Sequence, residues 1–169
     1  MHVTILPISA EHIEEFHRML DVVAREHKYL AFLEAPPLED TRAFIMRNIA
    51  RNNIQLVALV DGRVVGWADI LPKDRPIHAH VGVLGIGLVP EFRGKGVGTA
   101  LLRHVLEQGR KKYVRVELTV RAANTRAIAL YEKLGLQREG VCGDAVFVDG
   151  RYEDLIMMAI IDRPPALAG

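Results

Sequence analysis

A strand-like run that ends in a glycine-rich loop and leads directly into a helix constrains this sequence more than any other feature. The segment covers residues 88–102 and reads LVPEFRGKGVGTALL. Its glycines leave backbone N–H groups uncovered at the start of a helix, where the helix dipole favours anions. Arg93 and Lys95 add positive charge beside them. We therefore expect a diphosphate to bind between the strand and the helix.

Two common phosphate-binding loops do not fit this segment. A Walker loop needs Ser or Thr after its Gly-Lys pair, whereas Gly96 follows Lys95, so no hydroxyl is placed to hold Mg²⁺. The dinucleotide fingerprint Gly-x-Gly-x-x-Gly fails because Thr99 stands where its third glycine would be. Nucleotide triphosphatases and Rossmann-type dehydrogenases are therefore disfavoured.

The rest of the chain alternates helix and strand patterns around this loop. Asp61 and Gly62 separate two β-branched runs, which predicts a hairpin. The predicted strands cover 3–6, 54–60, 63–70, 80–89, 114–120, 136–141 and 152–161, the last two flanking a loop that contains Asp149 and Gly150. The predicted helices cover 13–23, 41–49, 96–110 and 124–134. This order predicts an α/β (α+β) fold with a mixed sheet of about seven strands and about four helices. No linker divides it, so we expect one domain over 1–162 and a disordered tail over 163–169.

Composition excludes several classes of protein. Lys plus Arg total 22 against 21 for Asp plus Glu, and this balance argues against a general nucleic-acid binder. Cys142 is the one cysteine, which excludes an internal disulfide and a cysteine-built zinc site, and we expect it to be a small buried residue of a strand. Ser9, the one serine, lies outside a Gly-x-Ser-x-Gly motif, so a serine hydrolase is disfavoured. The sequence shows neither an apolar run of the roughly 20 residues that a membrane span needs nor a secretory signal, so we expect a cytoplasmic protein.

Two motifs together resemble the signatures of the GNAT superfamily of N-acetyltransferases. Arg93-x-x-Gly96-x-Gly98 is similar to its coenzyme A pyrophosphate loop, Gln/Arg-x-x-Gly-x-Gly/Ala. Residues 124–136, NTRAIALYEKLGL, are similar to the second signature, Asn-x-x-Ala-x-x-Leu-Tyr-x-Lys-x-Gly-Phe, with Leu136 in place of Phe. The two motifs follow in the family's order with a helix and a strand between them. The resemblance implies the GNAT fold, whose mixed, mostly antiparallel sheet is splayed at the central strand.

The resemblance also implies roles for individual residues, with acetyl-CoA as the acetyl donor and no metal. The backbone of Ile86, Gly87 and Leu88 would bind the pantetheine arm. The pyrophosphate would be bound by the loop, which consists of Arg93, Gly94, Lys95, Gly96, Val97, Gly98 and Thr99. Asn124 would contact the coenzyme or cap its own helix. Tyr131 would lie beside the coenzyme sulfur and protonate the leaving thiolate as the general acid.

The residue that takes the proton of the acceptor amine stays open at this point. His80 is a candidate because it begins the predicted central strand and histidine titrates near neutrality. Glu34 is another, because it lies in the loop where the family often shapes its acceptor site. A solvated polar side chain is the alternative for each. His78 and His80 share a strand face, but two ligands without a third do not make a metal site.

The sequence therefore predicts an acetyl-CoA-dependent N-acetyltransferase that acts on the primary amine of a small molecule. The second half, with VELTV before Asn124 and DGRY at 149–152, looks most like the bacterial branch that acetylates amino acids and phosphinothricin. A peptide or protein acetyltransferase with an open acceptor groove is one alternative, and a non-catalytic acyl-CoA sensor is another. By analogy with the family we also expect a homodimer.

Overall fold

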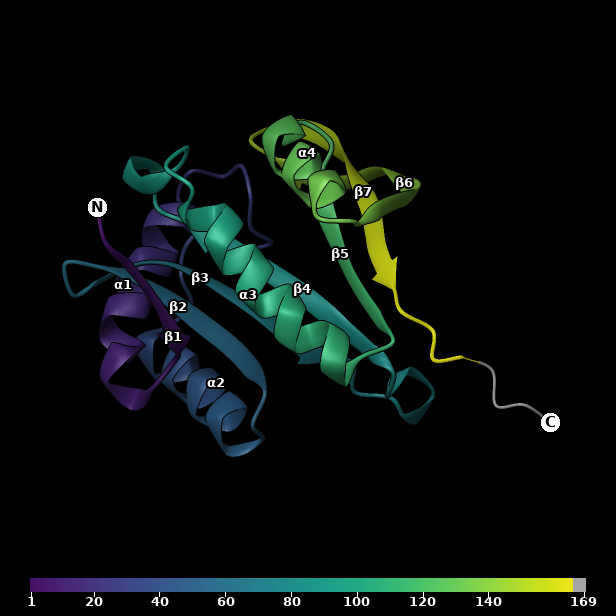
Figure 1. The fold of residues 1–169 in the computed structure, drawn as a ribbon. Coiled ribbons are helices and arrows are strands. Elements are labelled where there is room, and N and C mark those ends of the chain that lie inside the picture. The colour runs from purple at the N-terminus through teal and green to yellow at the C-terminus, as the bar shows by residue number, and fades with distance from the viewer. Residues whose placement is uncertain (166–169) are drawn as a thin grey trace.

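The computed structural model describes residues 1–165, which form one open sheet with helices on both faces (Figure 1). The four α-helices are α1 (Ile13–Ala24), α2 (Leu38–Ala50), α3 (Val97–Lys112) and α4 (Thr125–Lys133). The strands are β1 (Val3–Pro7), β2 (Ile54–Val60), β3 (Arg63–Pro72), β4 (Val81–Leu88), β5 (Arg115–Arg121), β6 (Gln137–Val148) and β7 (Arg151–Ile161). The predicted α/β class and element order are thereby confirmed.

The sheet has the strand order β1-β2-β3-β4-β5-β7-β6. Among the described strands, β4 and β5 form the one parallel pair, and the other pairings are antiparallel. The mixed, mostly antiparallel sheet that the resemblance implied is therefore present. The domain boundary at residue 162 stays a prediction. Of the predicted tail, residues 163–165 lie outside any helix or strand, and 166–169 lie outside the described residues.

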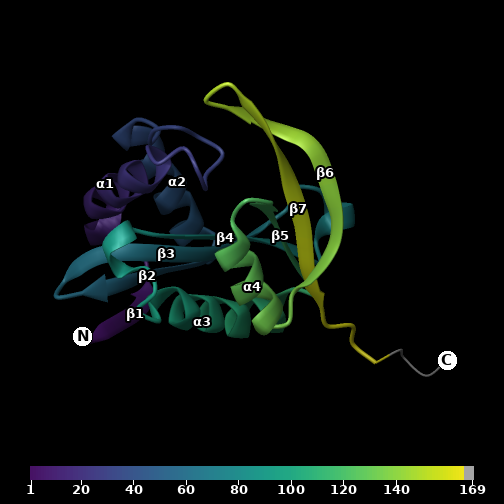
Figure 2. The same ribbon diagram turned by 90° about the horizontal axis from the view of Figure 1, so that it is seen from above.

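The helices form two layers, one on each face of the sheet (Figure 2). The larger core joins α3 and α4 to one face, and Leu101, Leu102 and Val105 of α3 are fully buried in it. The smaller core joins α1 and α2 to the other face, with Phe16 packed edge-on against Trp67 of β3. Each helix follows the spacing of its apolar residues, which places one stripe against the sheet.

The sheet opens between its two central strands. β4 and β5 pair only over Val81–Val83 and Arg115–Glu117, so from Leu84 onward β4 has no partner on that side. Meanwhile β3 stays paired with β4 from Pro72 to Gly66 in continuous register. The result is a V-shaped gap that is closed at the start of β4 and open toward the glycine-rich loop. This gap is the splay that the resemblance implied.

The predicted loop between the last two strands is wrong. β6 continues to Val148, and the reversal takes only Asp149 and Gly150, whose φ angles are 50° and 75°. Two positive φ values in a two-residue turn suit a tight hairpin, as at Asp61 and Gly62. β6 escapes detection because nearly all of its residues are exposed, so no buried face imposes an alternating pattern. The predicted burial of Cys142 is wrong for the same reason, since this cysteine is exposed on β6.

Glycine at position 82 is required by close packing between β4, β3 and the end of α3. A Cβ atom there would lie 2.4 Å from Ile70 Cγ2 and 2.6 Å from Tyr113 Cδ2, and both side chains are buried. Overpacking of this kind costs about 1–3 kcal/mol. We therefore expect Gly82→Ala to lower the free energy of unfolding by about that amount in a urea titration. Gly140→Ala is the matched strand control, because a Cβ there meets nothing within 4 Å; equal stability of the two variants would contradict the packing argument.

Candidate active site

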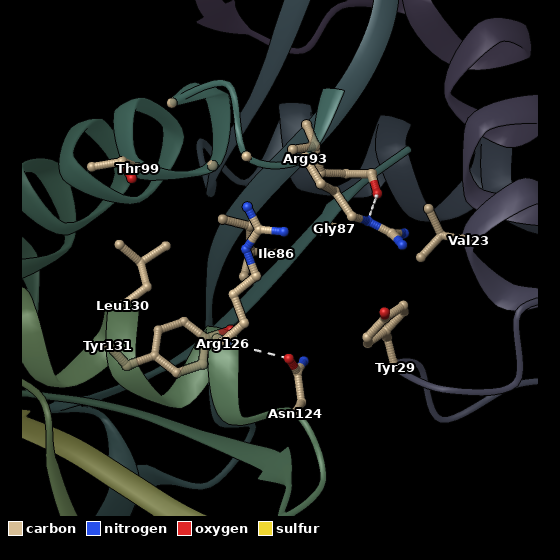
Figure 3. Close-up of a pocket in the computed structure, with 15 residues that line it drawn as sticks. Val23, Tyr29, Ile86, Gly87, Arg93, Thr99, Asn124, Arg126, Leu130 and Tyr131 are labelled. Atoms are coloured by element: carbon tan, nitrogen blue, oxygen red, sulfur yellow. Dashed lines mark hydrogen bonds between the residues drawn. The ribbon is translucent and has the colours of Figure 1, made fainter. Parts of the chain in front are cut away.

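One pocket joins the two motifs at the open end of the splay (Figure 3). Its volume is about 420 Å³, within the range of ordinary ligand sites. It is lined by the end of β4, the loop before α3 and the start of α3, the first turns of α4, and by Val23 of α1 and Tyr29 of the segment that follows α1. The lining residues are Val23, Tyr29, Ile86, Gly87, Leu88, Arg93, Gly94, Gly96, Gly98, Thr99, Asn124, Arg126, Ala127, Leu130 and Tyr131. Of the residues predicted to bind the coenzyme, only Lys95 and Val97 are not among them.

The glycine-rich loop has the geometry of an anion site. Gly94 and Gly96 adopt φ values of 75° and 85°, a region that side chains rarely occupy. A Cβ on Gly96 or Gly98 would meet no protein atom within 4 Å, so both glycines face open space at the N-terminus of α3. Arg126, which the sequence analysis missed, reaches the loop from α4 and places Nη2 2.6 Å from where a Cβ on Gly94 would lie. Backbone N–H groups, a helix dipole and this guanidinium therefore converge on one spot, and a coenzyme pyrophosphate fits it.

The Arg93 side chain is held by contacts within the protein. Its guanidinium forms a bidentate ion pair with Glu26, which lies just after α1, with Nη1 2.8 Å from Oε1, and its Nε donates to the Leu88 carbonyl at 2.9 Å. The Tyr29 ring lies 4.7 Å from its Cζ. These contacts fix the start of the loop against α1 and β4. In this structure Arg93 therefore positions the loop, and Arg126 supplies the cation at the glycines.

Tyr131 and Asn124 both reach the pocket from α4. Burial raises the pKa of Tyr131 to about 12, which keeps its hydroxyl protonated at neutral pH. The Asn124 side chain caps α4 by accepting a hydrogen bond from the Ala127 backbone N–H at 3.2 Å. Of the two predicted roles for Asn124, the structure thus contains the cap, and the residue also lines the pocket.

Neither predicted proton acceptor lies in the pocket. His80 is exposed in the turn before β4, at the closed end of the splay, and its carbonyl accepts from the Arg115 N–H. Glu34 is exposed and accepts from Arg25 Nη2 at 3.3 Å. The described residues include no group of three or more His, Cys, Asp or Glu side chains that could hold a metal ion. They also include no helix long and apolar enough to cross a membrane.

A carboxyl group that sequence reasoning missed lies on β3 next to the splay. Asp69 is 8% exposed and is paired in register with Gly85 of β4. Burial raises its pKa to about 7, and the Gly85 backbone amide offsets part of that rise. The sequence places Asp69 inside an apolar run, and only the strand register reveals that it lies beside the gap.

The segment between α1 and α2 is fastened across the open end of the splay. Arg121 of β5 is buried and donates to the backbone carbonyls of His27 at 2.6 Å and Leu30 at 2.9 Å. His27 Nδ1 lies 3.0 Å from Asp149 Oδ1 at the turn between β6 and β7. In Figure 2 this hairpin curves toward the α1–α2 segment. These contacts form a bridge over the α1–α2 face of the sheet beside the pocket.

Comparison with known proteins agrees with this geometry. The family model described as "Acetyltransferase (GNAT) family" matches residues 16–136. The chain belongs to the GNAT family. It is a GNAT-type N-acetyltransferase, because the match includes both signatures and the strand between them. A GNAT phosphinothricin acetyltransferase from Sinorhizobium meliloti, solved in complex with acetyl-CoA, superposes with a TM-score of 0.91 at 22% identity over 99% of this chain and 93% of that one.

Two relatives with named acceptors share part of this GNAT chain. The L-amino acid N-acetyltransferase AaaT of Escherichia coli is 37% identical over 107 residues, which are 62% of this chain and 66% of that protein. The [ribosomal protein bS18]-alanine N-acetyltransferase of Escherichia coli is 39% identical over 80 residues, 46% of this chain and 53% of that protein. The chain thus aligns with about two thirds and about half of these relatives' lengths. Their names include both a small-molecule and a protein acceptor.

The raised pKa of Asp69 makes the stability of this GNAT protein depend on pH. The unfolded chain releases the proton near 3.8, whereas the folded protein keeps it until about 7, so the free energy of unfolding falls as pH rises between these values. The penalty is complete above pH 7 and reaches up to about 4 kcal/mol. We expect Asp69→Asn to be more stable than the wild type at pH 8 and to match it near pH 4 in urea titrations. Asp74→Asn, at an exposed site, is the control; a pH-independent difference for Asp69→Asn would contradict the shift.

Proposed function

We propose that this protein transfers the acetyl group of acetyl-CoA directly to the primary amine of a small molecule, an amino acid or a related amine. The observation that carries the proposal is that one pocket holds both the anion-binding loop and Tyr131, at the gap in the sheet. The pyrophosphate would bind at Gly94, Gly96 and Gly98, and the unpaired edge of β4 would bind the pantetheine arm. Acetyl-CoA, when bound, supplies a thioester whose carbonyl carbon an uncharged amine can attack.

The chain's own groups supply the remaining chemistry. Backbone N–H groups of β4 beyond Val83 have no strand partner on the β5 side, so they are available to polarise a carbonyl oxygen. Tyr131 holds a proton at Oη up to a pKa of about 12 and can give it to a leaving thiolate. No covalent acyl-enzyme is required, in agreement with the lack of a serine near the pocket.

The bridge over the α1–α2 face favours a small acceptor. The contact between His27 and Asp149 joins the α1–α2 segment to the β6–β7 turn, and Arg121 anchors the same segment from β5. A closed surround suits a compact molecule, whereas a peptide that extends along the sheet needs an open groove. The names of the relatives support both acceptor classes, so a protein N-terminus is the second candidate. A cytoplasmic location stays a prediction from the sequence, and a homodimer stays an expectation by analogy with the family.

Thiol release from acetyl-CoA across a panel of acceptors tests the proposal. The panel holds the free amino acids, methionine sulfoximine, phosphinothricin, polyamines and short peptides. We expect release with amino acids or their analogues. Gly98→Leu is the control, because a side chain there enters open space at the loop and should abolish acetyl-CoA binding without backbone strain. Release with peptides alone would favour the second candidate, and acetyl-CoA binding without any release would favour a sensor.

Removal of the Tyr131 hydroxyl tests its role as the general acid. General acid–base groups contribute about 10²–10⁴-fold to rates. We expect Tyr131→Phe to lower kcat at least tenfold, while the Kd for acetyl-CoA, measured by calorimetry, changes less than about threefold. Tyr152→Phe is the matched control, because Tyr152 is 67% exposed on the outer hairpin. An unchanged kcat in Tyr131→Phe would remove the acid role from this residue.

A further inference from the structure

A row of buried polar side chains crosses the α1–α2 face of the sheet and leads to the splay. Asn48 of α2 donates to Gln55 Oε1 of β2 at 3.1 Å, and Gln55 is paired in register with Asp69 of β3. All three side chains are at least nine-tenths buried. Within residues 1–165, Gln55 Nε2 has no hydrogen-bond partner. The row therefore places an unused amide donor on the strand next to the carboxyl group, on the same face.

Of these three residues, Asp69 lies nearest the gap, because its strand β3 is the one that pairs with β4. Its strand partner is Gly85, two residues beyond Val83, where the pairing of β4 with β5 ends. A Cβ on Gly85 would lie 2.9 Å from Asp69 Oδ1, so the bare glycine leaves the carboxyl group directly against the β4 backbone. Two residues further along, Gly87 already lines the pocket. By strand register, the carboxyl group thus lies between the closed end of the splay and the pocket, on the α1–α2 face of the sheet and outside the set of residues that line the pocket.

Among the described residues, the groups that face Asp69 supply no counter-ion to its carboxyl group. Facing groups on the adjoining strands are Gln55 on β2 and Gly85 on β4, which are uncharged. On β5 the charged groups Arg115 and Glu117 pair with each other, with Glu139 and with Lys73. On α1, Glu15 accepts from the Val64 N–H, and His17 Nε2 lies 2.8 Å from the Pro36 carbonyl. Burial alone accounts for the rise of the Asp69 pKa to about 7, near the pH at which a general base works best.

The faces of the sheet separate this carboxyl group from Tyr131. The side chains of Trp67 and Asp69 lie on the same face of β3, because the two residues are two positions apart in the strand. Trp67 belongs to the core of α1 and α2. Tyr131 belongs to the core of α3 and α4 on the opposite face. The splay is a gap in the sheet, so it connects the two faces. A proton can therefore be taken up on the acceptor side and delivered on the thiol side.

We propose that the Asp69 carboxylate takes the proton of the acceptor amine in the transfer reaction proposed above, on which this inference rests. The amine nitrogen forms a bond to the acetyl carbonyl carbon while its proton passes to an Asp69 oxygen. The carbon–sulfur bond breaks, and the thiolate receives the proton of Tyr131 Oη. The two residues then exchange protons with solvent, which restores the starting state without an oxidant or reductant.

The pH profile of kcat/KM for Asp69→Asn tests this role. We expect the wild-type value to rise through a pKa of about 7 and then level off. Asp69→Asn should lose at least 100-fold at pH 7 and rise up to pH 9, because solvent then deprotonates the amine. Its Kd for acetyl-CoA should stay within about threefold of the wild type. Gly85→Ala, which crowds the carboxyl group but keeps it, should lower kcat by a smaller factor.

A second readout does not depend on turnover. The carboxyl ¹³C shift of Asp69 in the free protein, assigned by its loss in Asp69→Asn, should titrate near pH 7, and Asp74→Asn should leave both this titration and kcat unchanged. Asp69→Asn that folds and keeps the wild-type pH profile would overturn the inference alone, as would a titration near pH 4. A wild type that acetylates no acceptor in the panel would overturn the proposed function and this inference together.

Discussion

The three-residue limit on pairing between β4 and β5 is the constraint on which the rest of the molecule depends. At the closed end, Glu117 accepts from Arg115 at 2.6 Å and contacts Lys73, while Arg115 also reaches Glu139. This network joins the residue that follows β3 to β5 and β6 where the V begins. Further along, β4 keeps β3 as its partner and loses β5, so one edge of its backbone is left for a ligand. The pocket and the glycine-rich loop lie at the open end of that divergence, and Tyr131 reaches the pocket from α4, which follows β5.

Much of the fold could be predicted because its signals are local. A glycine-rich loop before an amphipathic helix and an Asp-Gly pair between β-branched runs are each readable within about ten residues. The same Asp-Gly signal is present at positions 149 and 150. The strand before it, β6, was predicted too short because its exposed residues show no alternating pattern. Two register shifts along β6 curve this hairpin away from a flat sheet. Such curvature depends on the partner strand and leaves little trace in the residues themselves.

The two ends of the candidate site differ in how well the sequence reveals them. The coenzyme end relies on backbone groups and glycine, which motifs specify directly, and most of its predicted residues line the pocket. The acceptor end relies on residues that only the register brings together. Asp69 stands 16 positions before Gly85 in the numbering, and its importance follows from their pairing and from burial. Arg93 is the opposite case. The motif identifies this residue, but its guanidinium pairs with Glu26, which is far away in the chain.

The exposed position of Cys142 matters for anyone who follows this reaction with a thiol reagent. It is the one cysteine in the sequence, and it stands on the outward strand β6. A dye that counts free coenzyme A will also count one thiol per protein chain, which sets a fixed background at high enzyme concentration. The same residue offers a single attachment point for a fluorophore or spin label. Because β6 pairs with β7, a label there would report on the hairpin that closes toward the α1–α2 segment.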